Sequence, residues 1–423
     1  MSDITITLLV LLCAAALFVT EKLPVGVTSI SAAVALCLLG VIDAKTAFSG
    51  LVDTNVILFA GMFVVAGAMF ETGLADEIGA KVVRTFGKSE RKLLIAVMVV
   101  GAALSTFLSN ISVVASLMPV VISIADSAGY SRSKFLLPLA IAAALGGMNS
   151  LVGTPPNLLV HSYMQKAGLP GFGFFEFAWY GIPVTILGII YMATIGVKLI
   201  PDRGNSADFA HRAFSQTAMD SAARRKQYLS GGIFVLTVLG MFFASTIKVP
   251  LHVTAVVGAL SLVFTGVMTD KQAYRSIDWN TILLTGGMMP VAAALAKTGA
   301  GKLISDITLS AFGTNPNPLL LTGAIFIVAA ILTQFMSNVA LTALLGPICI
   351  GMAQQMGVNP KSLVLAAGFA SSVAFATPVG TPATAIVFGP GNYKFIDFVK
   401  VGTPLLVLAF ILEMIISPLI WPF

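Results

Sequence analysis

The chain has 423 residues, of which 57% are hydrophobic and only 10% are charged, and its formal net charge is +6. Soluble proteins carry about 25% charged residues, so this composition excludes an ordinary soluble protein. Apolar runs of about twenty residues, each long enough to cross a bilayer as a helix, recur along the whole chain. The alternating segments of a membrane β-barrel are absent, so the sequence predicts an all-α polytopic membrane protein.

The first half of the chain contains six predicted spans. In order, they lie near residues 4–20, 24–42, 54–71, 91–127, about 133–165 and 178–200. An amphipathic stretch is expected around 75–87. Ser109-Asn110 breaks the fourth span, and the sequence GTPP at 153–156 breaks the fifth. The polar segment 202–227 that follows is typical of a linker outside the membrane.

The second half repeats the first. KLPVGVTS at 22–29 matches KVPLHVTA at 248–255, and the pairs DTNVIL/DWNTIL, ETG/KTG, SN/SN and GTPPN/GTPAT follow in order at offsets of 225 to 228. Asp53 and Asp278 begin equivalent spans and are expected to cap them. We interpret the chain as a tandem duplication, with a first repeat at 1–200, a linker at 201–228 and a second repeat at 229–423.

The repeat and the basic residues together predict a topology. If each Ser-Asn segment is a re-entrant hairpin, each half crosses the membrane about five times, and this odd number inverts the second repeat relative to the first. Placing the linker in the cytoplasm puts 18 of the 24 lysines and arginines in inner loops, as the positive-inside rule requires. We expect a cell inner (plasma) membrane protein with both termini on the outer side. The net positive charge is explained by the basic residues of the inner loops and does not indicate nucleic-acid binding.

Several functional classes find no support. The cysteines and histidines are scattered without metal-ligand spacing, and no nucleophile–base constellation indicates catalysis. Therefore neither an enzyme nor a cofactor is predicted, and no bound metal beyond Na⁺. No GxxxxGK[ST] loop is present, so transport would be driven by an ion gradient. The six scattered residues are Cys13, Cys37, Cys349, His161, His211 and His252.

The chemistry of the breaks indicates what they bind. Backbone groups exposed by a break are tolerated in a membrane where they line a polar cavity, and inverted repeats with matching broken helices are typical of secondary transporters. Asn and Ser side chains and freed carbonyl groups suit Na⁺, whereas helix N-termini suit an anion. The breaks hold no ionisable residue, which favours sodium over proton coupling. Glu413, deep in the last span, is expected to be paired structurally.

Other interpretations remain open. A single Ser-Asn pair can be a helix–helix hydrogen bond and a single GTPP a kink, although the duplication in register favours a functional site. A channel is a further alternative. Duplicated broken helices favour alternating access, and no filter-like run is present.

The paired Ser-Asn segments, GTPPN, and ATPVGTPATAIVFGPG at 376–391 resemble the divalent anion/sodium symporter family. These INDY-type dicarboxylate, citrate and sulfate carriers belong to the ion transporter superfamily, and the resemblance covers essentially the whole chain. It implies a homodimer in which a transport domain moves like an elevator against a scaffold. The implied scaffold helices lie at about 4–42, 178–200, 230–268 and 402–422, and the implied transport parts at about 53–165 and 278–392.

The resemblance also implies site residues. A first Na⁺ site would use Ser105, Ser109, Asn110 and the Gly153 carbonyl. A second would use Thr333, the Met336 carbonyl, Asn338 and the Gly380 carbonyl. The substrate would lie among Asn110, Ile111, Thr154, Pro155, Asn338, Val339, Thr381 and Pro382.

The chain departs from the family pattern at two positions. Ile111 and Val339 stand where the family has threonine, so two hydroxyl donors are lost. We therefore expect a sodium-coupled symporter of a small anion other than a C4-dicarboxylate or citrate, for example a monoanion with an apolar part. The alternative is a proton-coupled or exchange-type carrier of the same superfamily, of the arsenite, sulfate or Na⁺/H⁺ type.

Overall fold

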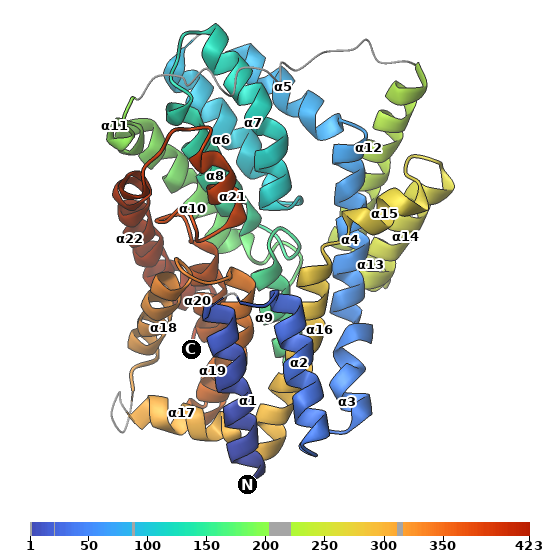
Figure 1. The fold of residues 1–423 in the computed structure, drawn as a ribbon, viewed down its shortest axis with the longest axis vertical. Coiled ribbons are helices and arrows are strands. Elements are labelled where there is room, and N and C mark those ends of the chain that lie inside the picture. Colours follow the sequence, from blue (N-terminus) through green and yellow to red (C-terminus); the bar gives the residue numbers. More distant parts are fainter. Residues whose placement is uncertain (1, 21, 87–88, 203–220, 311–315) are drawn as a thin grey trace.

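The computed structural model describes residues 2–20, 22–86, 89–202, 221–310 and 316–423, and these residues form an all-helical chain (Figure 1). Seven of the described helical segments, counting α3 to α4 as one and α10 to α11 as one, are long and apolar enough to cross a membrane. The predicted all-α polytopic membrane protein is confirmed. The helices of the first half are α1 Asp3–Thr20, α2 Val25–Leu38, α3 Ala44–Ser49, η1 Gly50–Val52, α4 Thr54–Glu71, α5 Leu74–Phe86, α6 Glu90–Ser105, α7 Asn110–Ser127, α8 Ser133–Gly147, α9 Pro155–Lys166, α10 Ala178–Tyr191, η2 Met192–Gly196 and α11 Val197–Leu199.

The second half contains the remaining helices. They are α12 Ser221–Phe242, α13 Ala244–Ile247, α14 Leu251–Phe264, α15 Asp270–Ser276, α16 Trp279–Thr298, α17 Ala300–Ser310, α18 Pro318–Leu332, α19 Asn338–Met356, α20 Pro360–Ser372, α21 Pro382–Phe388 and α22 Phe395–Ile420.

All four predicted breaks are present. Helix α7 begins at Asn110 and α19 at Asn338, each after a turn that separates it from the preceding apolar helix. Helices α9 and α21 both begin with proline in the first turn, where the missing N–H costs nothing and the fixed φ suits a helix. The aspartates Asp53 and Asp278 cap α4 and α16 by accepting hydrogen bonds from backbone N–H groups, as predicted.

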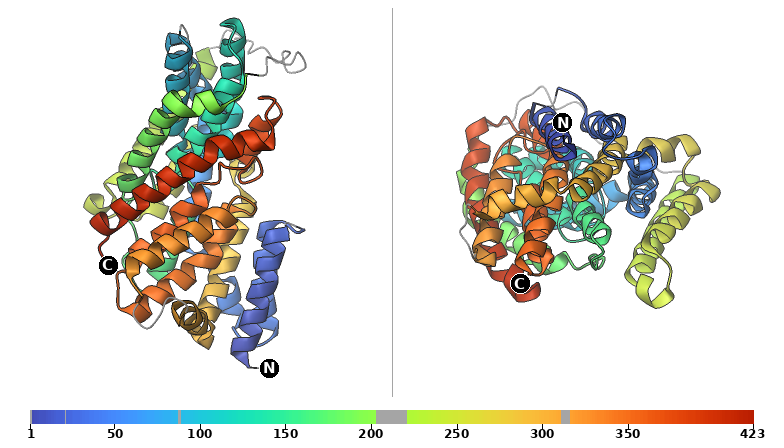
Figure 2. Two further views of the ribbon diagram at one scale, coloured as in Figure 1. Left: turned by 90° about the vertical axis from the view of Figure 1, so that its left-hand side faces the viewer. Right: turned by 90° about the horizontal axis from the view of Figure 1, so that it is seen from below.

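The helices pack into two groups (Figures 1 and 2). One group, which we call the companion bundle, consists of α1–α4 and α12–α16, with α2 packed along α16 and α4 along α14. The other group, the broken-helix body, consists of α6–α10 and α18–α22, with α8 packed against α6 and α7, and α20 against α18 and α19. The amphipathic helices α5 and α17 lie at opposite ends of the molecule (Figure 1).

The packing groups four helices differently from the predicted scaffold and transport parts. The segments 178–200 and 402–422 were expected with the scaffold, but α10 and α22 pack on each other and on α8 and α18. The Tyr180 and Tyr191 hydroxyls of α10 donate to the carbonyls of Ala409 and Val401 in α22 at 3.0 and 2.9 Å. Conversely, α4 and α16, expected in the transport part, belong to the companion bundle.

Glycine allows the closest of these contacts. A Cβ atom on Gly50 would lie 2.0 Å from the carbonyl oxygen of Gly286 in α16, and one on Gly287 would lie 2.6 Å from the carbonyl carbon of Ser29 in α2. Both neighbours are backbone atoms that cannot rotate away. The companion bundle therefore depends on the absence of side chains at these points.

We expect Gly50→Ala to destabilise the protein. The added methyl group must push η1 away from α16, and such overpacking costs about 1–3 kcal/mol. Thermal unfolding in detergent measures the effect as a lower Tm. Gly232→Ala in α12 is the matched control, because a methyl group added there would have no neighbouring atom within 4 Å. Equal Tm values for the two variants would contradict the tight contact.

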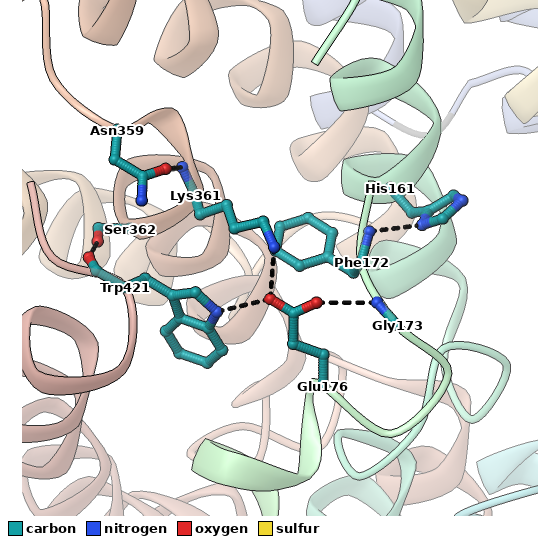
Figure 3. Close-up of polar contacts among 8 residues, drawn as sticks. All are labelled: His161, Phe172, Gly173, Glu176, Asn359, Lys361, Ser362 and Trp421. Carbon is teal, nitrogen blue, oxygen red and sulfur yellow. Dashed lines mark hydrogen bonds and ion pairs between the residues drawn. The ribbon is translucent and has the colours of Figure 1, made fainter. Parts of the chain in front are cut away.

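A polar clamp joins the two halves of the broken-helix body (Figure 3). Glu176, just before α10, accepts hydrogen bonds at Oε1 from Lys361 Nζ (2.6 Å) and Trp421 Nε1 (2.8 Å), and at Oε2 from the Gly173 N–H (2.8 Å). Lys361 also lies over the Phe172 ring, 5.0 Å from its centroid. The clamp thereby fastens the start of α20 and the end of the chain to the loop before α10.

The clamp predicts an acid-dependent stability. Burial opposes the charged form of Glu176, but the hydrogen bonds from Lys361, Gly173 and Trp421 outweigh it, and the pKa lies below its ordinary value of 4.5. Because the folded-state pKa is depressed, the stabilisation is complete above that ordinary value and is lost as the pH falls below it.

Glu176→Gln is expected to lower Tm at neutral pH, because the ion pair with Lys361 is lost. The same variant should lose less stability than the unmodified chain when the pH is lowered through 4.5, the ordinary carboxyl pKa. Thermal unfolding over a pH series measures both effects. Parallel pH profiles for the two proteins would show that the ion pair does not stabilise the fold.

Candidate functional site

A cavity of about 710 Å³ lies where the four breaks meet. Of the predicted site residues, all but Ser105, Thr333 and Met336 line it, so the fold brings together residues that are more than 200 positions apart. The break residues that line the cavity are Phe107, Ser109, Asn110, Ile111, Val152, Gly153, Thr154, Pro155, Pro156, Ser337, Asn338, Val339, Val379, Gly380, Thr381 and Pro382.

The three remaining residues are buried, and two of them lie directly against the asparagines. The Ser105 hydroxyl donates to Asn110 Oδ1 at 2.6 Å. The Thr333 hydroxyl lies 2.8 Å from Asn338 Oδ1 and 2.6 Å from the Ser371 carbonyl oxygen. The single hydroxyl hydrogen of Thr333 can be donated to only one of these two acceptors at a time. The oxygens of Thr333, Asn338 and Ser371 therefore lie close together with lone pairs that no hydrogen bond uses.

A pair of hydroxyl groups connects the breaks within each half. Ser150 Oγ donates to the Thr106 carbonyl at 2.5 Å and accepts from the Gly153 N–H at 3.1 Å. In the second half, Thr377 Oγ1 donates to the carbonyl of Gln334 at 2.7 Å and accepts from the N–H of Gly380 at 3.1 Å. Each hydroxyl therefore fixes one break relative to the other.

Sequence reasoning missed these two hydroxyls, although a signal was present. Ser150 and Thr377 are 227 positions apart, the offset of the GTP motifs, and each stands three residues before the glycine. A search for hydroxyl residues that share the repeat offset would have found them.

Oxygen atoms converge on Gly147, at the end of α8. A Cβ atom there would lie 2.6 Å from Asn110 Oδ1 and 3.1 Å from the Gly153 carbonyl oxygen. A Cβ atom on Gly153 would lie 2.8 Å from the Thr106 carbonyl oxygen. Side-chain and main-chain oxygens from both breaks thus share a small volume, as a bound cation requires.

An anion in the cavity would meet the dipoles of helix N-termini, but no basic side chain among the described lining residues. Helices α7, α9 and α19 begin at Asn110, Pro155 and Asn338, which all line it, and helix N-termini carry partial positive charge. Among the described residues that line the cavity none is Lys, Arg or His, and Asp278 is the one acidic residue.

The opposite wall is largely apolar and was not predicted, because no sequence motif marks it. It is formed by α2, α4, the start of α16 and the break residue Phe107. Ile111 and Val339 add to this apolar character from the break side. The residues of the wall are Val25, Phe59, Met62, Phe63, Ala66, Phe107, Asp278, Asn280, Thr281 and Leu284.

Glu413 lies apart from the cavity. It is fully buried in α22 and does not line the cavity. Neither of its carboxylate oxygens has a hydrogen-bond partner among the described residues, although Ser417 lies one turn further along the same helix. The structural pairing predicted for Glu413 therefore stays a prediction.

The helical fold and the cavity between broken helices define a membrane transporter. The profile of the citrate transporter (CitMHS) family matches residues 15–365 and 248–422, and the chain belongs to this family of the ion transporter superfamily. The predicted family resemblance is confirmed. The chain is a transporter and not an enzyme.

Several relatives cover nearly the whole chain. An uncharacterized transporter of Haemophilus influenzae is 31% identical over 92% of this chain and 86% of its own length. The sodium-dependent dicarboxylate transporter SdcS of Staphylococcus saprophyticus is 24% identical over 91% of this chain and 80% of its own length. The YdaH transporter of Alcanivorax borkumensis, a solved structure, shares the fold with a TM-score of 0.65 and 16% identity, covering 89% of this chain and 87% of that one.

Proposed function

We propose that the chain is a sodium-coupled symporter of a small anion, with elevator-type alternating access. The observation that carries the proposal is the meeting of two equivalent pairs of breaks in one cavity, with Asn110 and Asn338 in matching positions. The name of the relative SdcS, a sodium-dependent dicarboxylate transporter, supports sodium coupling.

The proposed Na⁺ sites follow the two Ser-Asn turns. The first uses Ser105, Ser109, Asn110 and the Gly153 carbonyl, and the second uses Thr333, Asn338, the Gly380 carbonyl and the Met336 carbonyl. The side-chain oxygens of both asparagines and the adjoining hydroxyls support these ligand sets, because Na⁺ in broken-helix transporters is coordinated by such oxygens and by unwound carbonyls.

The proposed substrate is a small anion of low charge with an apolar part. It would be held by the three helix N-termini and bound Na⁺, because no arginine or lysine of the described cavity lining could pair with a second carboxylate. The apolar wall and the side chains of Ile111 and Val339 would contact its hydrocarbon part. Thr154, Pro155, Thr381 and Pro382 complete the proposed substrate-binding residues.

The proposed architecture is two inverted-topology repeats, each with about five transmembrane helices and a re-entrant hairpin. In Figure 1, α5–α7 lie at the upper end and α17–α19 at the lower end, which supports inversion. We place the upper end and linker 201–228 in the cytoplasm and both termini outside, in the inner (plasma) membrane. The companion bundle serves as the scaffold and the broken-helix body as the transport domain.

We further propose that two chains assemble as a homodimer. The proposal rests on the family resemblance, in which paired scaffolds hold the moving domains in the membrane. The mass of the detergent-solubilised protein, measured by light scattering, tests it: a mass of one chain would contradict the dimer.

Glu413 supports the alternative of a proton-coupled or exchange-type carrier. A buried carboxyl group without a hydrogen-bond partner among the described residues is the kind of group that proton-driven carriers use. The alternative predicts that Glu413→Gln abolishes transport driven by a pH gradient. Sodium coupling predicts that the same substitution leaves sodium dependence intact.

A thermal-shift screen tests the proposed function. Purified protein is heated in Na⁺ or in choline at equal ionic strength, with dicarboxylates, citrate, sulfate, arsenite and small monocarboxylates. A ligand that binds only the folded state at 100 times its Kd adds about 2.7 kcal/mol of stability. We expect Na⁺ to raise Tm and a monoanion to raise it further only in Na⁺. A response that follows pH and ignores Na⁺ would contradict the proposal.

A further inference from the structure

A second cavity of about 710 Å³ lies between the two groups of helices, apart from the candidate site. The same three helices line both cavities. The starts of α9, α16 and α19 line the candidate site, whereas their second halves, together with the start of α17, line the second cavity. We call it the lower cavity, because α17 lies at the lower end of the molecule (Figure 1). Its lining residues are Tyr163, Lys166, Ala167, Ala292, Ala293, Leu295, Ala296, Gly299, Gly301, Lys302, Pro347, Ile348, Ile350, Gly351, Gln354 and Gln355.

Small residues leave the lower cavity open. Ala292, Ala293 and Ala296 contribute the α16 side of the lining, and Gly351 contributes to the α19 side. Gly299, with φ of 79°, ends α16, and a Cβ atom there would have no neighbour within 4 Å. Protein interiors rarely contain voids much larger than a water molecule, whereas small-molecule sites typically enclose about 300–1,000 Å³. The lower cavity therefore has the volume of a ligand site.

Hydrogen bonds fix two walls of the lower cavity. Pro347 has no N–H, so the Ala343 carbonyl one turn earlier in α19 lacks its helical donor. The buried Tyr163 hydroxyl of α9 donates to that carbonyl at 3.3 Å. Gln355 Nε2 of α19 donates to the Lys302 carbonyl at 3.2 Å, which holds the start of α17 beside the cavity. The walls are thus formed before any ligand binds.

The lower cavity is basic. Among its described lining residues are two lysines and no aspartate or glutamate. Lys166 stands in the last turn of α9, where a cation offsets the helix dipole, and its Nζ lies 3.6 Å from Asp53 Oδ2. Lys302 stands in the first turn of α17, where the dipole disfavours a cation, and in the described part of the chain it forms no ion pair. Helix stability therefore explains Lys166 but not Lys302, and the charge of Lys302 suits an anionic ligand.

We propose that the lower cavity binds an amphiphilic organic anion. Lys302 and Lys166 contact its carboxylate or phosphate group, and the side chains of Leu295, Ile348 and Ile350 contact its hydrocarbon part. Such a ligand touches α16 of the companion bundle and α9 and α19 of the broken-helix body at once. A ligand stabilises the conformation to which it binds best, so this one should slow the movement of one group against the other. That consequence rests on the proposed elevator function, whereas binding itself does not.

Photolabelling tests the proposed site. The protein in phosphatidylcholine nanodiscs is illuminated with a long-chain fatty acid that carries a diazirine group, and labelled peptides are identified by mass spectrometry. We expect label in residues 292–302 and 347–355, and several-fold less of it when an unlabelled amphiphilic anion competes. Label confined to residues 107–111 and 337–339 of the candidate site, or spread evenly over all helices, would overturn the inference.

The competitor identifies the source of the anion. Displacement of the label by phosphatidylglycerol, added to the nanodiscs in place of phosphatidylcholine, would assign the site to an anionic membrane lipid. Displacement by oleate alone would assign it to a free fatty acid. Displacement by neither would show that the lower cavity does not bind amphiphilic anions.

Two substitutions test the lining residues. Lys302→Gln removes a charge and Ala296→Phe fills the cavity with a ring, so each should lower the specific labelling several-fold. Both positions are exposed, and size-exclusion profiles check that the variants fold; if Ala296→Phe does not, Lys302→Gln decides. Lys45→Gln is the matched control, because Lys45 is an exposed lysine in the first turn of α3 and does not line the lower cavity. Equal labelling of all these proteins would contradict the site.

Uptake measurements separate this inference from the proposed function. The amphiphilic anion should slow sodium-dependent uptake several-fold in the unmodified chain and less in Lys302→Gln. Sodium-dependent uptake without label in residues 292–302 and 347–355 would overturn the inference and leave the symporter proposal intact. Specific labelling of these residues in a protein without sodium-dependent uptake would support the lower cavity as a site and contradict the proposed coupling.

Discussion

Replacing Asn110 or Asn338 with alanine is expected to weaken Na⁺ binding about ten- to 100-fold, by loss of an interaction of about 1.5–3 kcal/mol with a charged partner. Each substitution removes a ligand oxygen. Each substitution also removes a hydrogen-bond acceptor: Asn110 Oδ1 lies 2.6 Å from the buried Ser105 hydroxyl, and Asn338 Oδ1 lies 2.8 Å from the buried Thr333 hydroxyl. Sodium-dependent transport should therefore be lost in both variants, while the helices remain folded.

The Na⁺ concentration that half-maximally raises Tm measures this effect. Asn317→Ala is the matched control, because Asn317 only caps α18, accepting from the Leu319 N–H at 2.9 Å, and does not line the cavity. It should lower Tm slightly and leave the sodium dependence unchanged. An unchanged sodium dependence in both Asn110→Ala and Asn338→Ala would show that the cations bind elsewhere.

The second substitution with a large expected effect changes substrate specificity. Ile111→Thr combined with Val339→Thr should create a preference for dicarboxylates, because each new hydroxyl at the start of α7 or α19 can donate to a carboxylate in the cavity. A hydrogen bond to a charged group contributes about 1.5–3 kcal/mol, so dicarboxylate affinity should rise at least about tenfold per hydroxyl. The same change should weaken the binding of an anion with an apolar part.

Competition between succinate and the best monoanion in the thermal-shift screen measures the change. Ile111→Val combined with Val339→Ile is the control, because it keeps two β-branched apolar side chains and adds no hydroxyl. If the threonine variant prefers dicarboxylates no more than this control does, residues 111 and 339 do not determine substrate specificity.

The breaks could be predicted because their causes are local. Pro155 and Pro382 open helices by their own geometry, and the repeat identified the four breaks as two equivalent pairs. The grouping of helices could not be predicted in the same way. It depends on contacts between helices far apart in sequence, such as Gly287 of α16 against Ser29 of α2, and hydrophobic pattern alone does not choose between partners.

The site was predictable only where a polar motif marked it. Asn110 and Asn338 were found because a polar pair stands out in an apolar span. Phe59 and Phe107 line the same cavity, but phenylalanine in a membrane helix carries no signal that separates cavity lining from packing. The surroundings of Glu413 could not be predicted, because sequence cannot show whether a buried carboxyl group meets a partner.

Uptake by the purified protein in liposomes tests the central claim most directly. An inward Na⁺ gradient, with pH equal on both sides and K⁺ as the replacement ion, should accumulate the anion that gave the largest thermal shift, and accumulation should stop when K⁺ replaces Na⁺. Accumulation that follows an imposed pH gradient without Na⁺, and disappears in Glu413→Gln, would contradict sodium symport and support the proton-coupled alternative.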